Sequence, residues 1–177
     1  MALESLTAAL PAYANDLALN LGSLLEEPQL TDQQKWGCLI ASAHAVGQPT
    51  VVKAIEAAAL AAGLTETAKL AARGAAAIMA QNNIYFRALT LLKNQEYRSL
   101  RARLRMKIVT NPGVDKVDFD LWCVAVSAIN GCPDCLDAHE GNLRERGVDP
   151  VVVQTALRIA AVVHAVSRVF AGEAAAV

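Results

Sequence analysis

Two cysteines separated by two residues are the feature of this sequence that points most directly to chemistry. The segment Cys132-Pro133-Asp134-Cys135 is followed by His139, four residues beyond the second thiol. A CxxC pair can be a redox dithiol, half of a zinc site or part of a disulfide framework. The histidine favours a redox dithiol, because residues four apart share a helix face and an imidazole beside a thiol can accept its proton.

Thiol chemistry needs a thiolate, and the surroundings of the motif favour one. The turn before Cys132 and the proline after it place both cysteines at the start of a helix, where unpaired backbone N–H groups favour negative charge. We expect His139 to be the base beside Cys135 and Asp120, on the preceding helix, to orient its imidazole. Asp134 lies between the thiols and adds a negative charge that disfavours a neighbouring thiolate.

Zinc binding is an alternative use of the same residues, and it would require four ligands. The candidate ligands are Cys132, Cys135, His139, Asp120, His44, His164 and Cys123. No second CxxC or HxxxH pair completes the set. A thioredoxin fold is disfavoured because its CxxC follows a strand in a βαβ pattern, which is missing here. Cys38 and Cys123 each fall inside an apolar helix and are expected to be core residues.

Composition indicates one globular domain over residues 1–177. The chain is 54% hydrophobic and 19% charged, too apolar to be disordered, and its net charge of −1 argues against nucleic-acid binding. The first residues carry Glu4 where a signal peptide would be basic, and the charge-free stretch around the cysteines is far shorter than a membrane span. We therefore expect a cytoplasmic protein whose cysteines are reduced unless they are catalytic.

Helical periodicity and capping signals predict an all-α protein, since strand-like alternation is almost absent. Helix starts are predicted at Pro11, Thr31, Pro49, Thr65, Asp118, Pro133 and Asp149. The helix from Thr65 is expected to end near Ala80, with further helical pieces at 83–92 and 95–104, and the last helix to reach about Phe170. One basic stretch includes Arg98, Arg101, Arg103, Arg105 and Lys107. A solvated helix face is preferred over a docking patch for an acidic partner.

A weak internal repeat predicts two similar helical halves, approximately 31–80 and 118–170. The segments CLIASA, from Cys38, and CVAVSA, from Cys123, align at a separation of about 85 positions. At this separation Gly47 and Thr50 correspond to Cys132 and Cys135. A chance match between two alanine-rich helices is the alternative. The surplus of small apolar residues over charge also predicts a homo-oligomer, although a tightly packed monomer would have a similar composition.

Four segments resemble a known family. They are LPAYANDLALNL, GAAAIMAQNNIYFR, LRMKIVTNPG and, most specifically, FDLWCVAVSAINGCPDCLDAHE. Together they make nearly the whole chain similar to the alkyl hydroperoxide reductase D (AhpD) proteins of the carboxymuconolactone decarboxylase-like superfamily. The resemblance implies an all-helical fold with a duplicated core, a homotrimer and an antioxidant function in the bacterial cytosol.

The resemblance also implies redox partners. Proteins of this family regenerate an AhpC-type peroxiredoxin and have weak peroxidase activity, and dihydrolipoamide reduces their own disulfide. The electrons come from NADH through dihydrolipoamide dehydrogenase and a lipoylated acyltransferase subunit. No bound metal, flavin or haem is implied. Two rivals remain: decarboxylase-like chemistry, in which a dithiol has no role, and a non-catalytic helical module stabilised by zinc.

Carried over to this sequence, the family's redox cysteines fall on Cys132 and Cys135, and its relay histidine on His139. Cys135 would become the sulfenic acid and Cys132 would be the proton donor and resolving thiol. The relay carboxylate, usually Glu, falls on Asp120, whose shorter side chain would call for a water bridge to the imidazole. Asp134 also departs from the histidine that better-known members place between the thiols.

Overall fold

The computed structural model describes residues 2–176, and every regular element in this range is helical. The elements are α1 (Ala2–Ala8), a 3-10 helix η1 (Ala12–Ala14), α2 (Asn15–Leu25), α3 (Asp32–Val46), α4 (Pro49–Ala61), α5 (Glu66–Leu91), α6 (Glu96–Ser99), α7 (Lys107–Thr110), α8 (Lys116–Asn130), α9 (Pro133–Glu145) and α10 (Pro150–Ala175). The predicted all-α class is confirmed.

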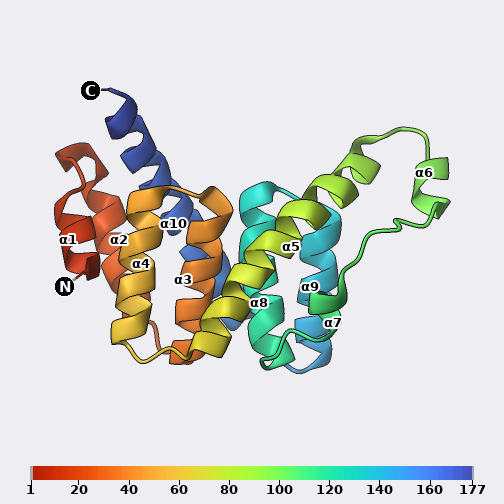
Figure 1. Cartoon of the computed structure of the whole chain (residues 1–177), viewed down its shortest axis with the longest axis horizontal. Coiled ribbons are helices and arrows are strands. Elements are labelled where there is room, and N and C mark those ends of the chain that lie inside the picture. The colour runs from red at the N-terminus through yellow and green to blue at the C-terminus, as the bar shows by residue number, and fades with distance from the viewer. Residues whose placement is uncertain (1, 177) are drawn as a thin grey trace.

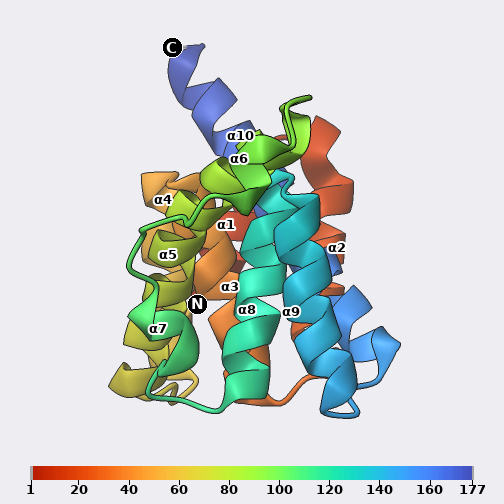
Figure 2. The ribbon, with the colours of Figure 1, turned by 90° about the vertical axis from the view of Figure 1, so that its right-hand side faces the viewer.

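Helix α8 is the centre of the fold. Its residues from Asp118 to Ser127 are all buried, and it packs against α3, α5, α9 and α10. Helix α5 runs diagonally across the molecule in Figure 1, and Figure 2 shows α8 and α9 side by side. Gly37 lets α3 approach closely, since a Cβ there would lie 2.0 Å from the Trp122 ring. A polar side chain on α8 therefore has to find its partners inside the protein.

Several helix boundaries follow the predicted local signals. Thr31 and Gln34 form the capping box at the start of α3, and Pro133 begins α9 after Gly131. Gly131 has a φ of 64°, a left-handed conformation that favours glycine. The cap predicted at Asp118 is wrong: Asp115 caps α8, and Asp118 lies inside the helix, where it accepts hydrogen bonds from the side chains of residues 33 and 34.

The region between residues 80 and 106 differs from the prediction. Helix α5 continues without a break to Leu91, because Asn82 and Asn83 are buried in side-chain contacts and do not form a turn. Only Glu96–Ser99 is helical in the next predicted piece, and residues 100–106 have no regular secondary structure. The arginines of this irregular segment are exposed and alternate with half-buried apolar residues. The basic stretch is thus part of a projecting loop, not a helix face (Figure 1).

The helices fall into two sets whose boundaries differ by a constant number of residues. Helix α3 begins at 32 and α8 at 116, a separation of 84, and the same separation relates α4 to α9 and α5 to α10 at both ends. This correspondence supports the proposed repeat but shifts its register by one position. Gln48 and Val51, not Gly47 and Thr50, correspond to Cys132 and Cys135.

Helix α10 is the one helix within residues 2–176 that is long and apolar enough to cross a membrane, judged by length and composition alone. It packs against α2, α3 and α8, and 44% of its most apolar window is buried inside the protein. These contacts are those of a core helix, whose apolar face is covered by its neighbours.

A charged cluster links α3, α4 and α5 away from the cysteines. Glu56 accepts two hydrogen bonds from Arg73, both 2.7 Å, and lies 2.8 Å from His44 Nε2. Although partial burial opposes it, hydrogen bonding to Arg73 and His44 holds the pKa of Glu56 below its usual value. Because this pKa is lowered on folding, the contribution of Glu56 to stability is present above the unfolded-state pKa of about 4.5 and is lost as the pH falls through the folded-state value.

We predict that Glu56→Gln lowers the free energy of unfolding by about 1–3 kcal/mol at pH 7, because it removes a charge-assisted pair of hydrogen bonds. The difference from wild type should shrink below pH 4. Urea unfolding of the variant and the wild type, at pH 7 and at a pH below 4, measures this difference in the free energy of unfolding. Glu66→Gln is the matched control, since the Glu66–Lys69 pair is exposed on the carboxylate side and should contribute less than about 1 kcal/mol. Equal losses in the two variants would contradict the prediction.

Candidate active site

Cys132 and Cys135 are joined by a disulfide at the start of α9, with their Cα atoms 5.4 Å apart. Cys132 is the N-cap residue, and its backbone N–H donates to the carbonyl of Ser127 on α8 at 3.1 Å. The left-handed turn at Gly131 makes this abrupt change of direction possible. The thiols are thus close enough to cycle between dithiol and disulfide, as a redox pair must.

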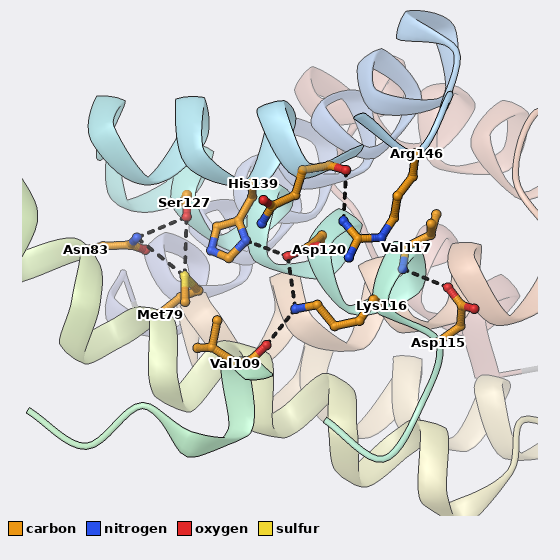
Figure 3. A network of polar contacts seen from close by, with 11 residues as sticks. Met79, Asn83, Val109, Asp115, Lys116, Val117, Asp120, Ser127, His139 and Arg146 are labelled. Carbon is orange, nitrogen blue, oxygen red and sulfur yellow. Dashed lines mark hydrogen bonds and ion pairs between the residues drawn. The ribbon is translucent and has the colours of Figure 1, made fainter. Parts of the chain in front are cut away.

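His139 and Asp120 form a buried pair beside the disulfide. His139 Nδ1 lies 2.8 Å from Asp120 Oδ1, and both residues are buried (Figure 3). The expected water bridge is wrong: α8 and α9 pack side by side, so the aspartate reaches the ring directly. An ionised carboxylate only accepts hydrogen bonds, so Nδ1 donates to it, and in a neutral ring Nε2 then carries the free lone pair.

Lys116 is a member of the site that the sequence analysis missed. Its Nζ lies 3.6 Å from Asp120 Oδ1 and donates a 2.6 Å hydrogen bond to the carbonyl of Val109 on α7. Figure 3 shows that Lys116 and His139 both approach the same oxygen of the Asp120 carboxylate. The signal was present in the sequence, because Lys116 and Asp120 are four residues apart on one helix.

A pocket of about 380 Å³ opens beside the disulfide. It is lined by Met79, Asn82, Phe86, Met106, Val109, Asp134, Cys135, Ala138, His139 and Asn142. Cys135 is 5% exposed and lines this pocket, whereas Cys132 is fully buried and does not. Cys135 is therefore the sulfur that a molecule in the pocket would meet first.

Comparison with known proteins agrees with this geometry. Residues 95–177 match the carboxymuconolactone decarboxylase family. The chain is 55% identical to the alkyl hydroperoxide reductase AhpD of Caulobacter vibrioides, over 99% of this chain and 96% of that protein. The AhpD proteins of Hyphomonas neptunium (54% identity, 99% and 97% covered) and Streptomyces avermitilis (51%, 98% and 98%) are similar over the same length. The chain belongs to the AhpD family.

The two departures of this AhpD-family member from the expected pattern have local compensation. Asp120 contacts His139 without an extra methylene, as described above. Asp134, between the thiols, pairs with Arg98 of α6 at 3.5 Å. The negative charge that Asp134 brings to the motif is thereby partly offset by a cation from the projecting loop.

A buried polar network positions the end of α8. Asn83 on α5 donates to Ser127 Oγ at 3.0 Å and accepts from Asn130 Nδ2 at 3.0 Å. Arg87 donates to the carbonyl of Asn130. Figure 3 shows Asn83 and Ser127 in contact across α5 and α8. These contacts hold the turn that leads into Cys132. The side chains that make them from α5 belong to the GAAAIMAQNNIYFR segment, and residue spacing in the sequence did not indicate this role.

The remaining candidate ligands lie elsewhere. His44 contacts Glu56, and His164 lines a separate pocket with Ala128 on α8. Within residues 2–176, no group of three or more His, Cys, Asp and Glu side chains has the arrangement of a metal site. Cys38 and Cys123 are buried core residues, as predicted. Burial raises the pKa of each thiol, and the nearby charges of Asp118 and Asp120 add to the effect.

We predict that iodoacetamide modifies the reduced protein first at Cys135, because Cys135 lines the same pocket as His139, whereas the other three cysteines are fully buried. Cys132 should react at least tenfold more slowly, and Cys38 and Cys123 only on unfolding, because alkylation needs an accessible thiolate. Peptide mass spectrometry of a time course at pH 7 identifies the modified residue. Faster modification of Cys132 than of Cys135 would reverse the assignment.

Proposed function

We propose that this protein is a dithiol oxidoreductase that reduces hydroperoxides weakly and reduces the disulfide of an AhpC-type peroxiredoxin. The observation that carries the proposal is Cys135 in a pocket, disulfide-linked to Cys132 and adjacent to the His139–Asp120 pair. The printed name of its relatives, alkyl hydroperoxide reductase AhpD, supports the same chemistry. Decarboxylase-like chemistry gains no support, because a dithiol has no part in it.

In the peroxidase half-reaction, His139 Nε2 accepts the proton of the Cys135 thiol. The thiolate attacks the terminal oxygen of ROOH, the O–O bond breaks, and the alkoxide takes a proton to leave as ROH. Cys135 is then a sulfenic acid. The Cys132 thiol attacks this sulfur, water leaves, and the disulfide forms. The sulfur pair has lost two electrons and the peroxide has gained them.

In the reductive half-reaction, one thiolate of dihydrolipoamide attacks the disulfide and forms a mixed disulfide, and its second thiol closes to lipoamide. Two electrons and two protons pass to Cys132 and Cys135. We propose that the lipoyl group is carried by an acyltransferase subunit and recharged from NADH by dihydrolipoamide dehydrogenase. This role belongs in the cytoplasm, where dithiol donors keep such a pair cycling.

The same dithiol would reduce an oxidised peroxiredoxin by exchange. The Cys135 thiolate attacks the partner's disulfide, and Cys132 resolves the mixed disulfide that forms. The proposed peroxiredoxin therefore needs only an accessible disulfide and a surface that fits the pocket mouth.

We predict that Cys135→Ser abolishes both hydroperoxide reduction and peroxiredoxin recycling. Cys132→Ser should still form a sulfenic acid at Cys135 but should fail to turn over, because the resolving thiol is gone. Dimedone labelling with mass spectrometry and a lipoamide-coupled NADH assay measure the two steps.

A count of free thiols with and without dihydrolipoamide, together with elemental analysis for zinc, separates the proposal from a zinc-stabilised module. The proposed redox function requires two more free thiols per chain after reduction than before it, and no stoichiometric zinc. Dimedone trapped on Cys132 instead of Cys135, or full turnover by Cys132→Ser, would contradict the assigned roles.

We also propose a homotrimer. Large apolar side chains are strongly exposed in the single chain, including Leu91 (75%) and Leu100 (62%), and association would cover them. We predict that light scattering at micromolar concentration gives three times the chain mass of 18.7 kDa. A single-chain mass would contradict the proposal. Leu91→Glu should weaken association by placing a charge in an apolar contact, whereas Lys93→Glu, on the adjacent exposed turn, is the control.

A further inference from the structure

Asp120 is a carboxylate in the interior with an unusual distribution of contacts. It is fully buried, and its Oδ1 alone receives both His139 and Lys116. Its Oδ2 is buried without a hydrogen-bond partner among the described residues. A buried ionised carboxylate is costly unless a cation compensates for the lost hydration. Lys116 is the one lysine or arginine within 4.0 Å of this carboxylate in residues 2–176.

Lys116 is also tied to the pocket wall. Its Nζ donates to the carbonyl of Val109 at 2.6 Å, and Val109 lines the pocket that holds Cys135. The same ammonium lies over the Phe119 ring, 5.7 Å from its centre, in a cation–π contact. The side chain is 29% exposed, so it spans from solvent to the buried carboxylate. One lysine thus contacts the pair behind the pocket and a wall of the pocket itself.

We infer that Lys116 is a positioning residue of the site: its ammonium keeps the Asp120 carboxylate ionised and aimed at His139, and its hydrogen bond to Val109 holds α7 against the pocket. The role in thiol chemistry rests on the proposed function, whereas the electrostatic role belongs to the resting protein. Lys116 is not among the residues that line the pocket, so we assign it no contact with a substrate.

The electrostatic role has a definite sign. A cation beside the Asp120–His139 pair repels any proton that the pair binds, so removing the charge of Lys116 should strengthen proton binding by the pair. The other titratable groups that face the pair are Cys123 on α8 and, along the pocket, Cys135 and Asp134 on α9. In the disulfide form Cys135 does not titrate, so the pair can be observed without it.

The test is an NMR pH titration of the histidine ring protons in the disulfide form. The chain has three histidines, and His139→Phe assigns the resonance that disappears. Lys116→Met and Lys116→Gln both remove the charge, but glutamine can still donate to the Val109 carbonyl. We predict that in each variant the pair binds its proton about tenfold more tightly, which moves the midpoint up by about one pH unit.

Lys107→Met is the matched control, because Lys107 is an exposed lysine at the start of α7 whose side chain makes no ion pair in the described residues. In this variant the midpoint of the His139 titration should stay within a few tenths of a pH unit of the wild-type midpoint. Unmoved midpoints in both Lys116 variants, or an equal shift in Lys107→Met, would overturn the inference. Neither peroxide nor partner is used, so the result stands whether or not the proposed function does.

A second measurement tests whether Lys116 acts through Asp120. The rate of sulfenic acid formation at Cys135 should fall about tenfold in Lys116→Gln, but Asp120→Asn with and without Lys116→Gln should agree within twofold, because members of one unit are not additive. Independent, multiplicative losses would show that Lys116 does not act through the carboxylate.

Discussion

The rest of the site depends on one constraint, the burial of a carboxylate. This carboxylate lies in the middle of a helix that is itself buried on all sides. Asp120 lies on α8, where the residues from 118 to 127 are all buried, and Asp120 itself is fully buried. Removing such a charge from water costs several kcal/mol, and partners must offset this cost. One partner comes from α9 as His139, and the other from one turn earlier on α8 as Lys116. The packing of α9 and α7 against α8 therefore sets the geometry of the pair and brings a cation next to it.

The two sets of helices show why chemistry is confined to one of them. At the separation of 84 residues, Trp36 and Ile55 stand where α8 and α9 carry Asp120 and His139. Both are apolar and take part in the core, so these two positions of the first set hold neither a carboxylate nor an imidazole. Gln48, which corresponds to Cys132, caps its helix by accepting from the backbone N–H of Val51. The same helical framework thus carries packing residues in one set and the cysteine pair with its buried histidine and aspartate in the other.

Local spacing predicted part of this site, and contacts across helices had to be observed. Pro133 and the i to i+4 relation of Cys135 and His139 define the motif within a few residues, so sequence was enough to propose it. The direct contact of His139 with Asp120 spans 19 positions and depends on how closely α8 and α9 pack. The alignment of the repeat from the sequence was one position out, because it matched identical residue types. The helix caps, which fix the course of the backbone, recur at a separation of 84 residues. The segment after α6 is irregular although a helix was predicted there, because helix propensity is a weak guide to local structure.

Accessibility orders the events of the proposed cycle. Cys132 is fully buried, whereas Cys135 lines the pocket, so a peroxide and a reducing thiol both meet Cys135 first. When the reductant attacks Cys135, the sulfur of Cys132 leaves as a thiolate in the interior, where it must be protonated promptly because an unpaired buried anion is costly. His139 lies on α9, which begins at the cysteine pair. It can therefore return to the Cys132 thiolate a proton that it accepted from the attacking thiol. A single base held by a buried carboxylate can therefore serve both halves of the cycle, accepting a proton from Cys135 in one and returning one toward Cys132 in the other.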